Sequence, residues 1–229
     1  MNITLLPEKK IILWDIDGTI LTLRSKNLES THLKALHRQG ISPKGTVKEQ
    51  SGLTDFEVLE GLLGNVETQE LLLKNAFNEL DNIFLANSHL RSLSLCKGVT
   101  EALNLSIQLG WINGVLTGNT HKRTIRKLQE SGIIQLFNHN FIFSCEYKDT
   151  RVMITERAEQ ILKNYNFKKI IIIGDSLMDI KISKIFNLPI ISVSTGLFSS
   201  EELDKYQPEL VLQDFQKDIN IFNNFLINI

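Results

Sequence analysis

Short apolar runs alternate with stretches of helical periodicity along much of the sequence. Five runs of four to six residues are rich in Ile, Val, Leu or Phe, at 11–16, 112–117, 141–144, 170–173 and 190–193. Such runs are typical of strands that are buried on both faces of a parallel sheet. The Gly, Asp and Ser residues that flank them favour strands over segments of buried helix.

Helical patterns lie between the later runs, at 120–131, 152–164 and 177–186. In the first of these, Ile125 and Leu128 stand three residues apart before a stop signal at Gly132. The final segment, 215–229, is amphipathic and is expected to pack on the sheet as a helix. This alternation of strands and helices predicts a doubly wound, Rossmann-like α/β fold with a parallel sheet.

The segment from Arg24 to Cys96 has a different pattern. It contains long helical stretches and no convincing strand run, with helices expected at 28–38, 55–63 and 68–87. We therefore predict two domains. Residues 1–23 and 97–229 form the α/β core, and residues 24–96 form an inserted all-helical cap.

Two acids follow the first apolar run, in the stretch Trp14-Asp15-Ile16-Asp17-Gly18-Thr19. In extended backbone, Asp15 and Asp17 project to the same side, toward the crevice where open α/β sheets bind ligands. Two such carboxylates repel each other by about 4 kcal/mol at an effective dielectric near 20. A proton or a cation such as Mg²⁺ would offset that repulsion. The alternative is that Asp17-Gly18 is only a turn.

Two further acids follow the fourth run, which ends in Gly174 and continues into Asp175 and Asp179. Asp175 comes directly off a buried strand and is a candidate to complete a Mg²⁺ site with Asp15 and Asp17. For Asp179 there is an alternative, because Ser176 and Asp179 have the spacing of a helix capping box.

Polar residues also follow the second and third runs. Thr117, Gly118 and Asn119 are candidates for a phosphate cradle at a helix N-terminus, although an ordinary N-cap at Asn119 or Thr120 would give the same pattern. Lys148 and Arg151 lie in the loop after the third run, where either cation can reach a phosphoryl group. Solvated basic residues at a helix start are the alternative.

Taken together, these pieces resemble the haloacid dehalogenase-like hydrolase superfamily. Its first motif, four hydrophobic residues followed by Asp-x-Asp-Gly-Thr, matches residues 11–19. Its second motif, a strand that ends in Ser or Thr, matches Thr117. Its fourth motif, Gly-Asp-x-x-x-Asp, matches Gly174, Asp175 and Asp179. The motifs span nearly the whole chain in the expected order.

The resemblance implies a role for each residue. Asp15 would be the nucleophile that forms an aspartyl-phosphate, and Asp17 would be the general acid and then the general base. Thr117 and the amide of Gly118, with Asn119 beside them, would bind the substrate. A Mg²⁺ ion would be held by Asp15, the backbone carbonyl of Asp17, Asp175 and Asp179.

The third motif departs from the common pattern, in which Lys is followed by Pro. Here Asp149 follows Lys148, and Arg151 lies closer to the helix. Some members similar to phosphoglycolate phosphatase carry Arg in the Lys role. We therefore assign this role to Arg151, with Lys148 as the second candidate.

The resemblance also points to a reaction. Dehalogenases and phosphonatases of the superfamily lack an acid at the position of Asp17, so phosphate-ester chemistry is implied. The helical insert resembles the cap of the phosphoglycolate phosphatase-like group, in which Gly52-Leu53-Thr54-Asp55 would place Thr54 and Asp55 toward the substrate. A helix N-cap at Thr54 is the alternative. We expect a Mg²⁺-dependent phosphatase of a small phosphorylated metabolite.

Other functions fit parts of the same pattern. A sugar-phosphate mutase of the same superfamily is the main enzymatic alternative, and a receiver-like or catalytically silent Mg²⁺- and phosphate-binding protein is the non-enzymatic one. The loop also contains Cys145 and Arg151 in the Cys-x5-Arg spacing of cysteine-dependent phosphatases. That loop has no Gly for a backbone phosphate cradle, and Glu146 and Asp149 would repel a thiolate and a phosphate.

Composition narrows the setting. The chain has 229 residues and a net charge of -1, which argues against a nucleic-acid or anionic-membrane binder. Its two cysteines form no disulfide framework or zinc site, and no membrane span or signal peptide is visible. We expect a cytoplasmic monomer or homodimer.

Overall fold

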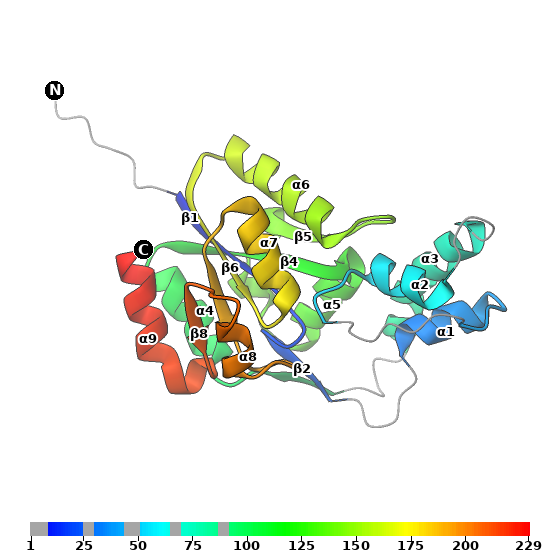
Figure 1. The fold of residues 1–229 in the computed structure, drawn as a ribbon, viewed down its shortest axis with the longest axis horizontal. Coiled ribbons are helices and arrows are strands. Elements are labelled where there is room, and N and C mark those ends of the chain that lie inside the picture. The colour runs from blue at the N-terminus through cyan, green and yellow to red at the C-terminus, as the bar shows by residue number, and fades with distance from the viewer. Residues whose placement is uncertain (1–8, 25–29, 44–50, 65–69, 87–91) are drawn as a thin grey trace.

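The computed structural model describes residues 9–24, 30–43, 51–64, 70–86 and 92–229 (Figure 1). A six-stranded parallel sheet with strand order β5-β4-β1-β6-β7-β8 forms its centre. The strands are β1 (Lys9–Trp14), β4 (Trp111–Thr120), β5 (Ile142–Cys145), β6 (Phe167–Gly174), β7 (Ile190–Val193) and β8 (Leu210–Leu212). The predicted α/β fold is confirmed, and each of the five apolar runs contributes a strand. The sixth strand, β8, was missed because it has only three residues.

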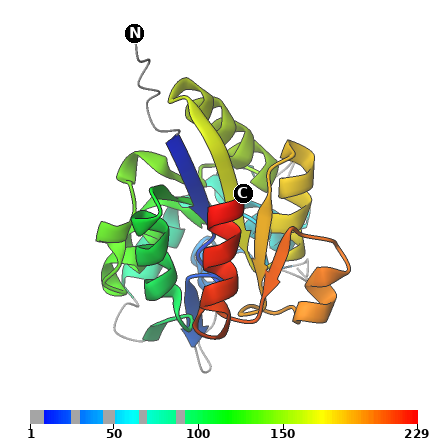
Figure 2. The ribbon, with the colours of Figure 1, turned by 90° about the vertical axis from the view of Figure 1, so that its left-hand side faces the viewer.

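Helices cover both faces of the sheet (Figures 1 and 2). They are α4 (Val99–Gln108), α5 (His121–Glu130), α6 (Arg151–Asn164), α7 (Leu177–Phe186), α8 (Ser200–Asp204) and α9 (Phe215–Asn228), with short 3-10 turns η2 (Ile134–Leu136) and η3 (His139–Phe141). The sequence predicted α5, α6, α7 and α9 but not α4 or α8. The five-residue α8 is too short to show a helical period.

Side chains of β1 point alternately to the two faces of the sheet, and each face has its own buried apolar cluster. Ile11 and Leu13 belong to one buried cluster with α6 and α7, whereas Ile12 and Trp14 belong to a second cluster with α4, α5 and α9. Because successive strand side chains point to opposite faces, an unbroken apolar run is what a strand covered on both faces requires. The same strand therefore anchors both helical layers and fixes where the chain leaves the sheet.

The C-terminal helix packs against the sheet as predicted. Phe215, Phe222 and Leu226 are its buried residues. The Trp14 ring lies 5.4 Å from the Phe215 ring and 6.2 Å from the Phe222 ring, centroid to centroid. Such tilted and edge-on aromatic contacts add about 0.5–1.5 kcal/mol each beyond the area that they bury.

Three helices of the inserted segment lie together at the right of Figure 1. They are α1 (Thr31–Arg38), α2 (Asp55–Leu63) and α3 (Glu70–Ala86), and they pack against one another. The predicted bounds of α2 are confirmed. Residues 28–29, 68–69 and 87 of the other two predicted helices lie outside the described residues.

A two-stranded antiparallel ribbon connects this segment to the core. Strand β2 (Leu21–Arg24) pairs with β3 (Ser92–Leu95), with Leu21 opposite Leu95. The expectation that residues 24–96 contain no strand is therefore wrong, because four residues pair here without an extended apolar run. The division into residues 1–23 with 97–229 and residues 24–96 stays a prediction, and the ribbon lies across its boundaries.

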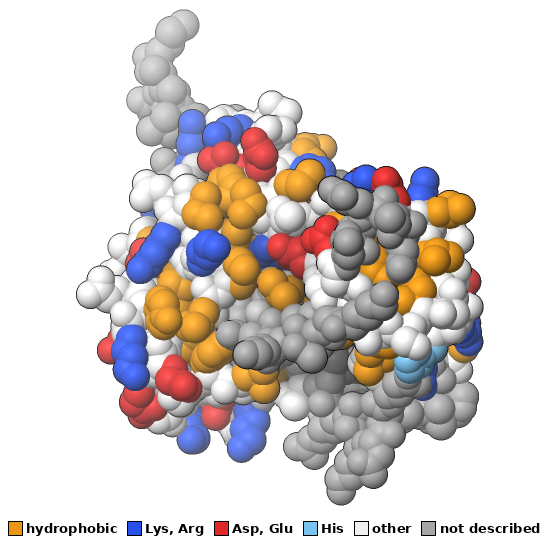
Figure 3. Space-filling model, turned by 45° about the vertical axis from the view of Figure 1, so that its right-hand side comes forward, with side chains coloured by type: hydrophobic (Ala, Val, Ile, Leu, Met, Phe, Trp, Pro, Cys, Tyr) orange, Lys and Arg blue, Asp and Glu red, His pale blue; other side chains and the backbone are white. Residues whose placement is uncertain are grey.

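The surface carries charges of both signs. On the face shown in Figure 3, Lys and Arg side chains are interspersed with Asp and Glu, as the net charge of -1 leads one to expect. Among the described residues, no helix combines the length and the apolar character that crossing a bilayer requires.

Candidate active site

A pocket of about 410 Å³ lies where the carboxyl ends of the central strands meet the inserted helices. From the core, its lining includes seven predicted site residues, which are Asp15, Asp17, Thr117, Gly118, Asn119, Arg151 and Asp175. Gly18 and Thr195 also line it. The inserted segment contributes His32, Ser51, Gly52, Leu53, Asp55 and Val58. This is the place at which open α/β sheets bind ligands, because the loops after parallel strands converge there.

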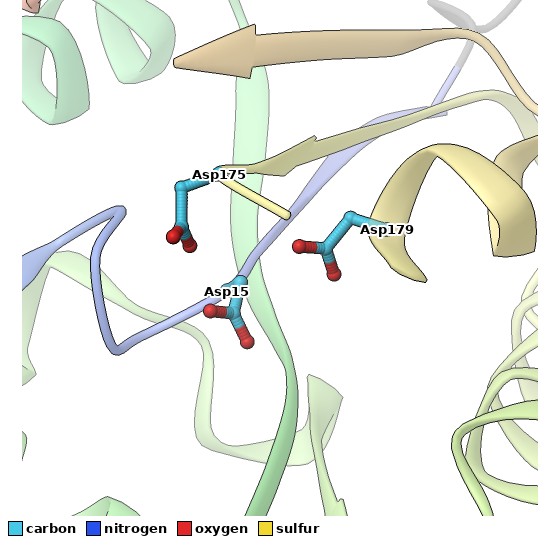
Figure 4. A group of neighbouring side chains, drawn as sticks. All are labelled: Asp15, Asp175 and Asp179. Carbon is cyan, nitrogen blue, oxygen red and sulfur yellow. The ribbon is translucent and has the colours of Figure 1, made fainter. Parts of the chain in front are cut away.

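Three buried acids form a cluster at the base of the pocket (Figure 4). Asp15 follows β1, Asp175 follows β6, and Asp179 lies in the first turn of α7. One carboxylate oxygen from each lies within 4.8 Å of the others. The sequence predicted this convergence because Asp15 and Asp175 directly follow neighbouring strands of the sheet.

Burial makes the ionised form of this cluster costly. It raises the pKa of Asp15 to about 7, with Arg151 opposing the shift and the Asp179 and Asp17 carboxylates adding to it. Burial, followed by the Asp15 and Asp179 carboxylates, raises the pKa of Asp175 well above its usual value. The cluster therefore favours either protons or a cation.

Glycines allow the chain to pass close to Asp175. Gly18 has a φ of 89°, and a Cβ at Gly18 or at Gly196 would overlap the Asp175 carboxylate. The Asp175 carboxylate also accepts a hydrogen bond from the Thr19 hydroxyl at 3.1 Å. Two residues of the Asp-Gly-Thr stretch therefore serve Asp175. Gly18 leaves room for its carboxylate, and Thr19 donates a hydrogen bond to it.

Asp179 has both of the roles that its sequence allowed. Its Oδ2 accepts bonds from the backbone N–H and the hydroxyl of Ser176, so the capping box of α7 is formed. Its Oδ1 accepts a bond of 2.7 Å from Arg151. Asp179 is therefore a helix cap that also belongs to the acid cluster.

Arg151 lies within the cluster rather than in solvent. It is the first residue of α6, and its Nη2 donates to Asp15 at 3.1 Å, to Asp179 at 2.7 Å and to the Leu116 carbonyl at 3.0 Å. Its side chain is 1% exposed. Its Nε and Nη1 are buried and have no hydrogen-bond partner among the residues that the structure describes. Two donors on a pocket-lining guanidinium thus remain for an anionic ligand.

Lys148, the second candidate for this role, is directed away from the pocket. It lies in a tight turn with a φ of 71°, its side chain is 53% exposed, and it pairs with Glu70 of α3. The structure therefore does not bring Lys148 to the site. Its position at the turn, before the N-cap Thr150, sends the side chain toward the inserted helices.

Asp17 is separated from the acid cluster although it lines the same pocket. Strand β1 ends at Trp14, and the chain then turns, with the Ile16 carbonyl accepting from the N–H of Ile20 and Leu21. Asp17 forms an isolated β-bridge with Leu21, and the expectation that Asp15 and Asp17 project to the same side stays a prediction. The Asp17 side chain contacts the Lys127 ammonium and accepts a bond of 2.7 Å from the Asn119 amide.

Lys127 is a pocket residue that the sequence analysis missed. Its side chain is 0% exposed, and it lies on α5 with the buried residues Arg123, Thr124 and Leu128. The spacing of Arg123 and Lys127 by one helical turn, beside Thr124 and Leu128, is a signal that places all four on one face. That face packs near Phe84 of α3, whose ring lies 5.7 Å from the Lys127 ammonium.

The carboxyl end of β4, residues 117–120, contacts the inserted segment. Thr117 accepts from the Asn119 amide at 2.8 Å, and Thr120 is the N-cap of α5, without a side-chain capping bond. A Cβ at Gly118 would overlap the Leu53 carbonyl. A glycine at position 118 therefore lets the backbone of residues 53–54 pack against β4. The sequence-based expectation that it also lets a ligand approach stays a prediction.

Thr54 and Asp55 are held by structural contacts. Thr54 forms a capping box with Glu57 and donates to the Asp149 carbonyl at 2.8 Å, so the N-cap interpretation is confirmed for Thr54.

Asp55 lines the pocket, but its carboxylate binds Arg123 at 2.5 Å and His32 at 2.9 Å. Burial raises the pKa of Asp55, but Arg123 and His32 outweigh it and hold that pKa far below its usual value. Arg123 and His32 are further pocket residues that the sequence analysis missed.

The charges at the base of the pocket fit a divalent cation. With all three acids ionised, Asp15, Asp175 and Asp179 carry three negative charges, and the Arg151 guanidinium offsets one of them. Two negative charges remain in a buried site, and oxygen donors are the ligands that Mg²⁺ prefers. The donor set and the raised pKa values of Asp15 and Asp175 are therefore consistent with a magnesium site.

The geometry argues against the cysteine-dependent alternative. Burial raises the pKa of the Cys145 thiol to about 12, so it is not a thiolate at neutral pH. The Arg151 guanidinium of the Cys-x5-Arg spacing bonds to Asp15 and Asp179.

Comparisons with known proteins place the chain among relatives. The model of the haloacid dehalogenase-like hydrolase family matches residues 12–193. A phosphoglycolate phosphatase from Nitrosococcus oceani is 23% identical over 228 residues, which cover 96% of this chain and 99% of that protein. A candidate haloacid dehalogenase-like hydrolase from Bacteroides fragilis has a TM-score of 0.68 at 18% identity, covering 92% of this chain and 99% of the other. A candidate β-phosphoglucomutase from Bacteroides vulgatus has a TM-score of 0.62 at 17% identity, covering 97% and 91%.

Proposed function

The chain belongs to the haloacid dehalogenase-like hydrolase family, and from this premise we propose that it is a Mg²⁺-dependent phosphatase of a small phosphorylated metabolite. The relative from Nitrosococcus oceani, named as a phosphoglycolate phosphatase, supports a phosphoric monoester as the substrate class. Family membership speaks against the receiver-like and catalytically silent alternatives. The pocket volume of about 410 Å³ suits a small ester.

One observation carries the proposal. A buried carboxylate, Asp15, lies 3.1 Å from the Arg151 Nη2, and the Nε and Nη1 of the same guanidinium have no partner among the described residues. A phosphoryl group bound to these donors would lie beside Asp15, which is the arrangement that nucleophilic attack needs. The hydroxyl of Thr117, which lines the same pocket, supports the expected phosphate cradle.

The reaction then divides into two displacements. In the first, an oxygen of Asp15 attacks phosphorus, the bond from phosphorus to the leaving oxygen breaks, and that oxygen takes a proton from the Asp17 carboxyl group. In the second, the Asp17 carboxylate takes a proton from water as the water oxygen attacks the aspartyl-phosphate. Asp15 is regenerated, and inorganic phosphate leaves.

Asp15, Asp175 and Asp179 would hold the metal, with the backbone carbonyl of Asp17 as a further ligand. When bound, Mg²⁺ would neutralise charge between the anionic nucleophile and the anionic phosphoryl group. The inserted helices, which line one side of the pocket, would exclude bulk water and select the ester.

A sugar-phosphate mutase is the second candidate, because the chain shares its fold with the candidate β-phosphoglucomutase from Bacteroides vulgatus. A mutase would return the phosphoryl group to another hydroxyl of the same sugar instead of transferring it to water. Incubation with a hexose 1-phosphate separates the two, since a mutase yields hexose 6-phosphate and a phosphatase yields free phosphate.

The direct test is a panel of phosphate esters assayed with Mg²⁺ for release of inorganic phosphate. The panel should contain phosphoglycolate, sugar phosphates, nucleoside monophosphates and p-nitrophenyl phosphate. We expect turnover of at least one small ester, with kcat in the range of roughly 1–1000 per second that is usual for enzymes. If every ester is left intact at all Mg²⁺ concentrations tested, the proposed function is wrong.

The choice between the two third-motif cations gives a further prediction. Arg151→Lys is expected to lower kcat/KM by roughly 100-fold, because a lysine loses the forked donors that contact Asp15, Asp179 and the phosphoryl group. Lys148→Ala is expected to stay within about twofold of the wild type, since an exposed ion pair with Glu70 contributes little. Steady-state kinetics on the best ester of the panel measures both, and a larger loss in Lys148→Ala would reverse the assignment.

A further inference from the structure

Lys127 is buried in the wall of the pocket, in contact with an acid that the proposed reaction needs. It lies almost two turns into α5, and helical side chains lean toward the N-terminus of their helix. Its ammonium therefore reaches back to the carboxyl end of β4, where it donates to the Asn119 Oδ1 at 2.8 Å. It also contacts the Asp17 Oδ2, after β1.

These contacts close a ring of three side chains. The amide nitrogen of Asn119 donates to the Asp17 Oδ2 at 2.7 Å and to the Thr117 hydroxyl at 2.8 Å, while its amide oxygen accepts from Lys127. The ring fixes the orientation of the Asp17 carboxyl group, because two donors, one from α5 and one from the end of β4, bind the same oxygen.

The second oxygen of Asp17 is left without such a partner. Among the described residues, none forms a hydrogen bond to the Asp17 Oδ1, although this atom is buried. A buried polar atom without a partner is uncommon in folded proteins. In a pocket that also contains Asp15 and the unpaired donors of Arg151, the Oδ1 is the oxygen that remains for a ligand.

A purely structural role explains these features poorly. Removing an ammonium group from water costs several kcal/mol, and an ion pair in a protein interior often does not repay such a cost against an apolar pair of the same size. Here a lysine is withdrawn completely from solvent to reach a carboxyl group whose own side chain is 35% exposed. What the pair supplies is a fixed direction for the Asp17 carboxyl group.

We propose that Lys127 is a positioning residue that, together with Asn119, turns the Asp17 Oδ1 toward the leaving oxygen of the substrate. This inference rests on the proposed phosphatase function. The proton still passes from Asp17 to the leaving oxygen as the bond to phosphorus breaks, and Lys127 exchanges no proton in that step. Its contribution is orientation, which general acid catalysis requires before any transfer can occur.

Leaving groups of different basicity test this role. An alkyl phosphate leaves as a strongly basic alkoxide and needs the proton, whereas the nitrophenolate of p-nitrophenyl phosphate leaves without one. We expect Lys127→Met to lower kcat/KM, which reports the first displacement and not the later hydrolysis of the aspartyl-phosphate, by on the order of 10- to 100-fold for the best alkyl phosphate. For p-nitrophenyl phosphate, kcat/KM should stay within about threefold of the wild type. A lysine that serves only the fold would lower both rates together.

Arg126→Met is the matched control, since Arg126 is the adjacent residue of α5 and pairs with Glu130 at the surface. We expect it to change neither rate. In an Asp17→Asn background, Lys127→Met should produce no further discrimination between the two esters. If Lys127→Met does not fold, as judged by circular dichroism, Asn119→Ala removes the other donor to the Asp17 Oδ2 and should discriminate in the same direction.

The outcomes are distinct. An equal loss on both esters, or no loss on either, overturns the role of Lys127 while leaving the phosphatase function intact. A wild-type protein that hydrolyses no ester overturns the proposed function itself.

Discussion

Asp15→Asn is expected to abolish phosphate release, lowering kcat by on the order of 10⁴-fold or more, because an amide cannot form the aspartyl-phosphate. Every other proposed contribution, including that of Arg151, acts on a phosphoryl group that Asp15 must attack. Release of inorganic phosphate from the best ester, followed over hours, measures the loss. Cys145→Ser is the control and should retain wild-type kcat, since the buried thiol takes no part. Activity that survives in Asp15→Asn but disappears in Cys145→Ser would contradict this assignment.

The same substitution should stabilise the metal-free protein at neutral pH. Burial raises the pKa of Asp15 to about 7, so between about pH 4 and 7 the folded state holds a proton that the unfolded state has released. The free energy of unfolding therefore falls as the pH rises through this range, and Asn removes that penalty. In EDTA we expect Asp15→Asn to melt at least about 3 °C above the wild type at pH 8, with a smaller difference at pH 5. If Asp15→Asn instead melts below the wild type at pH 8, the ionised Asp15 carboxylate does not destabilise the folded protein.

Loss of activity together with gain of stability identifies a functional residue. Replacing a structural acid such as Asp55, which is bound by Arg123 and His32, would destabilise the protein, because the buried Arg123 guanidinium would be left without its carboxylate. Among the described residues, Asp15 has one cationic partner, Arg151, and it lies among other carboxylates. Measuring kcat and Tm on the same variant therefore separates the two kinds of buried acid.

The acids of the site could be predicted from the sequence because each follows a strand. Asp15 directly follows β1, and Asp175 directly follows β6. Because these strands are parallel neighbours in the sheet, both acids lie at the same edge. Asp17 shows where this reasoning fails. Its direction depends on the turn after Trp14 and on the partners that the turn meets, and neither Lys127 nor Asn119 is near it in the sequence.

The cations were harder to predict because their burial is decided by tertiary packing. Arg123 and Lys127 lie on a helix with many polar residues, and they resemble surface residues until α3 is placed beside them, with the Phe84 ring 5.2 Å from the Arg123 guanidinium. Lys148 and Arg151 lie three residues apart in one loop, so the sequence cannot choose between them by position. The choice depends on the turn at Lys148 and on where α6 begins.

Removing divalent metal is expected to lower kcat by at least about 100-fold, with recovery on addition of Mg²⁺. Without the ion, three carboxylates share a buried site with one guanidinium, and the phosphoryl group adds further negative charge. Phosphate release after EDTA treatment and dialysis, then with increasing Mg²⁺, measures the effect. Full activity in EDTA would contradict the metal dependence of the proposed reaction.

Binding of Mg²⁺ should also be visible without any substrate. Mg²⁺ at about 100 times its Kd adds about 2.7 kcal/mol to the free energy of unfolding, which corresponds to a rise in Tm of roughly 5 °C or more for a chain of this size. The rise should shrink from pH 8 to pH 5, because burial raises the pKa values of Asp15 and Asp175 and the ion must then displace their protons.

Asp175→Asn should lose most of this rise in Tm, whereas Asp204→Asn, which removes an exposed acid of α8, should keep it. A Tm rise that is equal at both pH values, or that persists in Asp175→Asn, would place the ion elsewhere on the protein, because only the buried cluster couples metal binding to the protonation of Asp15 and Asp175.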